Sequence, residues 1–179
     1  QPEAEIGCLY EWDGIKYVID TLSTSYQEMV PPSKIYTDEM AKMSVKYIKE
    51  KKPVLGAFIF DNPDHVGHDA GHDTPAYYAN LKELDGYIGQ IIQATKDAGI
   101  YENCIFIVTS DHGGIDHGHG GKTLEEINTP FIIAGKGVKK SGEFQESMMQ
   151  FDCAPTVLEI FGLEGPQVWV GRSMSQVFE

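Results

Sequence analysis

Two short apolar runs, each followed at once by a cluster of aspartates and histidines, constrain the fold of this chain more than any other feature. The runs are residues 54–60 and 104–109. Their length and composition favour strands buried on both faces, as in a parallel sheet. Between them, residues 75–98 carry apolar side chains on one helical face, with Thr74 as the N-cap and Pro75 as the first helical residue. This order predicts a right-handed βαβ unit whose two parallel strands are near neighbours.

The rest of the chain predicts further elements of an α/β fold. Strands are expected at residues 6–12, 131–134 and 143–149, helices at residues 14–22, 37–51 and 152–161, and a loop at residues 23–33. Thr37 is a suitable N-cap for the second of these helices. With 179 residues, of which 41% are hydrophobic, the chain has the size of a single domain, residues 1–179. We expect a mainly parallel sheet flanked by helices.

Composition excludes several classes of partner. The net charge of −13 argues against a nucleic-acid-binding protein, which needs a basic face, and against attraction to an anionic membrane surface. The longest apolar run, residues 54–60, is far shorter than the roughly 20 residues of a membrane span, so no span is expected. Cys8, Cys104 and Cys153 are too widely spaced to form a zinc-type pair or a disulfide framework.

The two clusters contain all six histidines of the chain, between His65 and His119. Because the carboxyl ends of parallel strands share one edge of a sheet, both clusters are expected at the edge where open α/β sheets bind ligands. Aspartate and histidine without cysteine suit zinc, manganese or iron rather than a structural zinc knot. Two such clusters suggest a pair of ions roughly 4 Å apart, which can stabilise the attacking and leaving oxygens in phosphoryl transfer.

At these residues the chain resembles the alkaline phosphatase superfamily, in particular its type I phosphodiesterase and nucleotide pyrophosphatase branch. The matching motifs are Pro63-Asp64 with Gly67-His68, residues 109–113, His119 followed by residues 130–135, and residues 151–162. The resemblance covers roughly residues 54–171. It implies that the chain is the C-terminal part of an alkaline phosphatase-like domain.

The resemblance also implies the ligands of two divalent metal ions, most typically zinc. Asp64, His68 and His119 would hold one ion, and Asp111 and His112 would hold the second. His119 is preferred to its rival, the histidine two residues earlier, because its spacing to the Pro130 motif fits the family.

Two further groups of the family site are expected upstream of these motifs, namely an aspartate ligand and a serine or threonine nucleophile. Asp13 resembles that aspartate only superficially, and no serine or threonine lies in a fitting context. We therefore expect five ligands and no catalytic nucleophile in this chain, which alone would be inactive.

The function implied is hydrolysis of phosphodiester or pyrophosphate bonds in a small phosphate-ester substrate. The alternatives are a phosphomonoesterase or sulfatase of the same superfamily, or a non-catalytic metal-binding fragment. The resemblance also suggests a periplasmic or extracellular location. Neither the exact substrate nor the oligomeric state follows from the sequence.

The remaining polar residues of the clusters have simpler interpretations. His65, His72 and His117 are expected to be solvated loop residues, and so is Asp116. Asp61 ends a strand and is expected to cap the loop, the alternative being that it holds a metal ligand in place. Loop flexibility is the interpretation of the glycines in the second cluster, Gly113, Gly114, Gly120 and Gly121.

Overall fold

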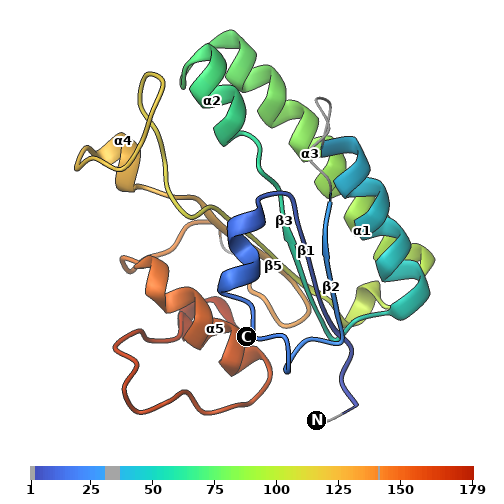
Figure 1. The fold of residues 1–179 in the computed structure, drawn as a ribbon. Helices are drawn as coiled ribbons and strands as arrows, with labels where there is room; N and C mark the ends of the chain where they lie inside the picture. The colour runs from blue at the N-terminus through green and yellow to red at the C-terminus, as the bar shows by residue number, and fades with distance from the viewer. Residues whose placement is uncertain (1–2, 31–36, 141) are drawn as a thin grey trace. The chain divides into compact units, whose positions relative to one another are not determined.

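A computed structural model describes residues 3–30, 37–140 and 142–179 (Figure 1). Its strands are β1 (Ile6–Tyr10), β2 (Tyr26–Met29), β3 (Leu55–Ile59), β4 (Ile105–Thr109) and β5 (Phe131–Gly135). Its α-helices are α1 (Thr37–Lys51), α2 (Asp64–Ala70), α3 (Pro75–Asp97), α4 (Leu124–Ile127) and α5 (Cys153–Ile160). Short 3-10 helices are η1 (Asp13–Tyr17), η2 (Tyr101–Asn103), η3 (Gln150–Asp152) and η4 (Ser175–Val177). The chain forms two compact units, Gln1–Glu102 with Gly114–Ile127, and Asn103–Gly113 with Asn128–Glu179.

The first unit contains a three-stranded parallel sheet in the order β2-β1-β3. Tyr10, at the end of β1, is level with Met29 of β2 and with Ile59 of β3. The carboxyl ends of all three strands therefore lie at one edge of the sheet. β2 falls in the segment predicted to be a loop, because its four residues carry no apolar alternation and the strand forms by pairing with β1.

Helices α1 and α3 pack against each other beside this sheet (Figure 1). Two hydrophobic clusters join them to the strands, one around Leu9, Met40 and Tyr47 and one around Ile48 and Ile91. The predicted starts of both helices are confirmed. Thr74 caps α3 by accepting the backbone N–H of Tyr77, whereas the predicted capping side chain of Thr37 lies outside the described residues.

The pairing of β3 and β4 differs from the prediction. β3 pairs with β1, whereas β4 pairs antiparallel with β5, and the two strands do not pair with each other among the described residues. β3 is also less buried than predicted, since Leu55 retains 38% exposure at the edge of its sheet. An apolar run indicates a strand but does not determine which neighbour occupies its edge.

The predicted helix at residues 14–22 shortens to the single turn η1. The carboxylate of Asp20 accepts the backbone N–H of Leu22 at 3.0 Å and the hydroxyl of Ser23 at 2.6 Å. Such local bonds stabilise a turn in place of a continuing helix.

The second unit contains the β4–β5 pair, in which Ile107 lies opposite Ile133, and the predicted helix α5. Gly162 ends this helix with φ of +65°, as predicted. The strand predicted at residues 143–149 is absent from that described segment, which has no regular structure. No helix among the described residues is both long and apolar enough to cross a membrane.

Candidate metal centre

Helix α2 places Asp64 and His68 on one face, because residues four apart are neighbours on a helix. The Nε2 atom of His68 lies 3.3 Å from Oδ2 of Asp64. Gly67, between these two residues, is helical and buried, and its lack of a side chain leaves space for the ring of His72.

His119 joins this pair from the second cluster. Its Nε2 lies 3.7 Å from Oδ1 of Asp64, and one ligand atom from each of Asp64, His68 and His119 lies within 4.8 Å of the other two. Oδ1 of Asp64 is buried and has no hydrogen-bond partner within the described ranges. A buried carboxylate oxygen without a donor, beside two imidazoles, fits a divalent cation.

The orientation of His68 also suits a metal ligand. Its Nδ1 lies 2.9 Å from the backbone oxygen of His117, so this nitrogen carries the proton and donates it to the carbonyl. In the neutral form of the imidazole the lone pair is then on Nε2, the nitrogen that faces Asp64. Ligating histidines generally donate their second nitrogen in this way, which fixes both tautomer and ring orientation.

His117 does not belong to the group of three. Its Nδ1 lies 3.0 Å from the backbone oxygen of His68, so its ring joins α2 to the loop before His119. His65 is exposed and lies 3.5 Å from Asp69, in agreement with the prediction of a solvated residue. The structure therefore places His119, rather than its rival, beside Asp64 and His68.

His72 is not the solvated residue that we predicted. Its ring is half-buried, and its Nδ1 lies 3.0 Å from the backbone oxygen of Asp116, which also accepts the His72 backbone N–H at 2.6 Å. A Cβ atom at Gly67 or Gly114 would lie 2.4 or 2.1 Å from this ring. The imidazole thus occupies a slot between two glycines and joins the first cluster to residues 114–116.

Asp111 and His112 lie in the other compact unit, directly after β4. Nε2 of His112 lies 3.6 Å from Oδ2 of Asp111, and its Nδ1 lies 2.8 Å from the backbone oxygen of Gly113. The side-chain amide of Gln150 donates to the Asp111 carbonyl at 2.6 Å. The contact of Nδ1 with the Gly113 carbonyl fixes the orientation of this ring.

Glu11 is a residue near the end of β1 that the sequence analysis missed. It is only 5% exposed, and its Oε2 accepts the backbone N–H of Asp61 at 2.7 Å. Burial raises the pKa of the Glu11 carboxyl, and the Asp61 N–H partly opposes this shift. Glu11 follows an apolar strand, as Asp61 follows β3, and this position in the sequence could have identified it as a candidate site residue. Asp13, the superficial candidate for a sixth ligand, is instead exposed and paired with Lys16 at 2.9 Å.

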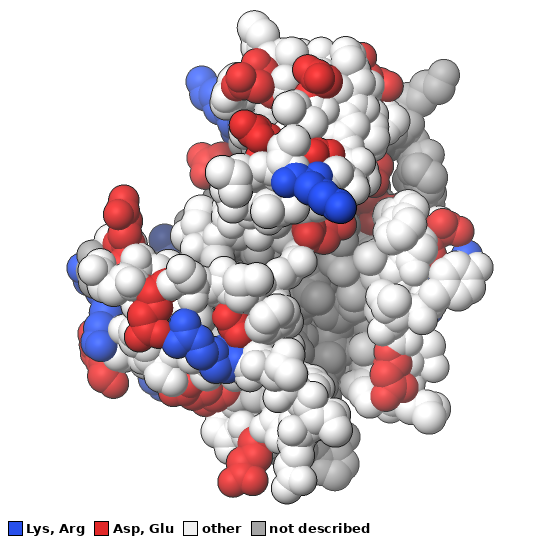
Figure 2. Space-filling view, turned by 90° about the vertical axis from the view of Figure 1, so that its left-hand side faces the viewer, with Lys and Arg blue, Asp and Glu red and all other residues white. Residues whose placement is uncertain are grey.

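Charge is distributed without a continuous basic patch on the face that Figure 2 shows, where Lys and Arg side chains are scattered among Asp and Glu. An anionic substrate at such a surface would need a local source of positive charge, which bound divalent cations can supply.

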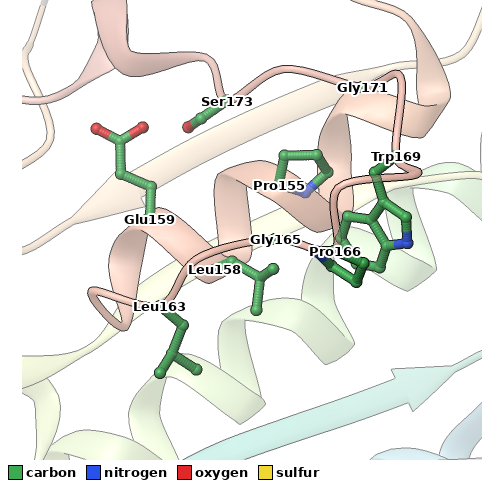
Figure 3. A pocket seen from close by; sticks show the side chains of 9 residues that line it. All are labelled: Pro155, Leu158, Glu159, Leu163, Gly165, Pro166, Trp169, Gly171 and Ser173. Atoms are coloured by element: carbon green, nitrogen blue, oxygen red, sulfur yellow. The ribbon is translucent and has the colours of Figure 1, made fainter.

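A separate pocket of about 290 Å³ lies beside α5 in the second unit (Figure 3). Its apolar walls are formed by Pro155, Leu158, Leu163, Pro166 and Trp169. The carboxylate of Glu159 at its margin accepts the hydroxyl of Ser175 at 2.6 Å.

Comparison with curated proteins shows relatives with several activities in their names. The human ectonucleotide pyrophosphatase/phosphodiesterase family member 5 is 29% identical over 103 residues, which are 57% of this chain and 21% of that protein. A 2,3-bisphosphoglycerate-independent phosphoglycerate mutase from Acetivibrio thermocellus is 27% identical over 94% of this chain and 32% of its own length. Arylsulfatase K from Bos taurus is 33% identical over 55% of this chain and 19% of its own length. The chain thus spans about a fifth to a third of these relatives.

Comparison with solved structures confirms the predicted fold class. A putative sulfatase from Bacteroides thetaiotaomicron has a TM-score of 0.72 at 17% identity, over 96% of this chain and 54% of that one. The model of the type I phosphodiesterase / nucleotide pyrophosphatase family matches residues 15–152, most of the chain. The chain therefore belongs to the type I phosphodiesterase / nucleotide pyrophosphatase family, within the alkaline phosphatase superfamily.

Proposed function

We propose that this chain supplies ligands for two divalent zinc ions in a hydrolase of phosphodiester or pyrophosphate bonds. Asp64, His68 and His119 hold the first ion, and Asp111 with His112 contributes to the second. The observation that carries the proposal is the buried Oδ1 of Asp64, which has no hydrogen-bond donor in the described part of the chain and lies 3.7 Å from Nε2 of His119.

The chain's own residues prepare this centre. The Asp64 carboxylate supplies negative charge to a cation, and the His117 carbonyl keeps the Nε2 lone pair of His68 directed at the same place. A divalent ion, when bound, offsets the charge that develops on phosphoryl oxygens. No described residue is proposed as the nucleophile, so we expect turnover from the whole protein and not from these 179 residues alone.

The family membership and the name of the human relative, an ectonucleotide pyrophosphatase/phosphodiesterase, support a small phosphate-ester substrate. The 33% identity to arylsulfatase K supports a second candidate, a phosphomonoesterase or sulfatase. A periplasmic or extracellular location belongs to the same proposal, supported by the Drosophila melanogaster relative named an extracellular sulfatase homolog.

Zinc titration of the 179-residue chain tests the metal centre. Calorimetry is expected to show binding that Asp64→Ala and His119→Ala each abolish or weaken at least tenfold. His65→Ala is the matched control, because His65 lies on the same helix but is exposed and directed to Asp69. Equal zinc binding by all four proteins would overturn the assignment of these ligands.

A test of the substrate class requires the full-length gene product. Its rates on bis-p-nitrophenyl phosphate, p-nitrophenyl phosphate and p-nitrophenyl sulfate with added zinc separate the candidates. We expect the diester to be hydrolysed fastest. Preference for the monoester or the sulfate would favour the second candidate, and no activity on any of the three would remove the hydrolase proposal.

A further inference from the structure

Glu126 is a buried carboxylate in an exposed stretch of chain. It lies in the short helix α4 (Figure 1) and is 9% exposed, whereas Glu125 beside it is exposed. Burial of a carboxylate is costly unless hydrogen-bond donors replace its water. The hydrogen-bond donors that surround Glu126 therefore indicate its structural role.

Both carboxylate oxygens of Glu126 are engaged by residues just after His119. Oε1 accepts the backbone N–H of Gly121 at 2.7 Å. Oε2 accepts the hydroxyl of Thr123 at 2.8 Å and its backbone N–H at 3.3 Å. The Glu126 N–H in turn donates to the Thr123 backbone carbonyl at 3.2 Å, so only the glutamate half of a capping box is formed, in which the carboxylate accepts the Thr123 N–H.

The charge on Glu126 is stabilised by the same contacts. The Thr123 hydroxyl and then the Gly121 N–H are the main causes that hold the pKa of Glu126 below its ordinary value, and the imidazole of His119 adds a smaller Coulombic contribution. Three donors converge on this carboxylate, and its charge interacts with the side chain of the proposed ligand.

The chain leaves space for this carboxylate at Gly121. A Cβ atom there would lie 2.4 Å from Oε2 of Glu126. The preceding Gly120 has φ of +94°, a conformation that other residues rarely adopt. The two glycines after His119, which we had interpreted as loop flexibility, thus allow a close turn around a fixed anion.

From these contacts we infer that Glu126 is a positioning residue, which fixes the loop after His119 and so holds that imidazole beside Asp64. The inference rests on the proposed metal centre. Glu126 is not one of the proposed ligands, and its hydrogen bonds go to Gly121 and Thr123. A carboxylate that merely capped α4 would affect stability and leave the geometry of the metal centre unchanged.

Zinc affinity and the Co²⁺ absorption spectrum of the 179-residue chain distinguish the two roles. We expect Glu126→Ala to bind zinc about 10- to 100-fold more weakly, as for other residues that orient ligands, and to change the d–d bands of bound Co²⁺. Glu126→Gln keeps one acceptor oxygen and is expected to lose less. Glu125→Ala, the adjacent exposed control, is expected to match the wild type in both measurements.

Gly121→Ala provides an independent perturbation, since it displaces the carboxylate without removing it, and we expect the same loss of zinc affinity. If Glu126→Ala fails to fold, Glu126→Gln, Gly121→Ala and the milder Thr123→Ala decide the question. Wild-type zinc affinity and Co²⁺ bands in the folded variants would overturn the inference while leaving the metal centre in place. Absence of zinc binding by the wild type would instead overturn the metal centre itself, and the inference with it.

Discussion

His68 and His117 hold each other through reciprocal contacts between ring and backbone. Nδ1 of His68 lies 2.9 Å from the carbonyl oxygen of His117, and Nδ1 of His117 lies 3.0 Å from the carbonyl oxygen of His68. These contacts join residues 49 positions apart in the chain. Because His119 follows two residues later, the reciprocal pair determines where its imidazole can lie.

His117→Ala removes one half of this pair, but the backbone carbonyl that orients His68 remains. We therefore expect a moderate loss of zinc affinity, about 10-fold, measured by competition with a chromophoric chelator. His119→Ala should cost much more, because it removes a proposed ligand. If His117→Ala were instead the more damaging of the two, His117 would be the ligand and His119 the supporting residue.

Because the His72 ring lies against Gly114, we expect substitutions at two glycines of one loop, Gly114 and Gly118, to differ in their effect on stability. Gly114→Ala would place a Cβ atom 2.1 Å from the His72 ring, whereas a Cβ atom at Gly118 would have nothing within 4 Å. We expect Gly114→Ala to lower the free energy of unfolding by roughly 1–3 kcal/mol, the usual cost of overpacking. Urea unfolding measures this, and equal effects of Gly114→Ala and Gly118→Ala would contradict the slot.

Glu11 predicts a pH dependence of stability. Because burial raises its pKa, the native state retains a proton that the unfolded state has already released. Stability should therefore fall as pH rises from the ordinary glutamate value of about 4.3 through the raised value. Glu11→Gln does not titrate, so its stability relative to the wild type should increase from pH 4 to pH 7 in urea unfolding. A constant difference across this range would show that Glu11 is not desolvated.

Asp152 anchors the second unit. It is 2% exposed, and its two carboxylate oxygens accept the backbone N–H groups of Met149 at 2.8 Å and Arg172 at 2.9 Å. Bonds to a charged acceptor contribute about 1.5–3 kcal/mol each, so Asp152→Ala should cost on the order of 3 kcal/mol or more. Hydrogen exchange of the Met149 and Arg172 amides checks this, with the exposed Glu164→Ala as control. Unchanged protection of both amides would contradict the anchoring role.

Local chemistry explains which parts of the fold were predictable. Thr74 and Pro75 mark the start of α3 by their own hydrogen-bonding and backbone properties, and Gly162 similarly marks the end of α5. The pairing of β3 depends on which strand occupies its edge, and β2 exists only through its bonds to β1. Nothing in a linear pattern of apolar residues specifies those partners.

The candidate site likewise contains features that the sequence indicates and features that depend on distant parts of the chain. The resemblance to the family grouped Asp64, His68 and His119 as ligands, because its motifs can be matched residue by residue in the sequence. The roles of His72 and Glu11 follow from burial and from bonds to distant backbone groups, which the sequence does not display. The interaction of Thr123 with Glu126 could have been predicted from the sequence, since a threonine followed three residues later by glutamate is the pattern of a capping box.

Zinc should stabilise the folded chain through the residues proposed to bind it. A ligand at 100 times its Kd contributes about 2.7 kcal/mol, which corresponds to a rise in Tm of roughly 5–10 °C for a protein of this size. We expect this rise in the wild type and in His65→Ala, and its loss in Asp64→Ala, where the buried carboxylate oxygen is gone. A similar rise in Asp64→Ala would place the stabilising zinc elsewhere on the chain.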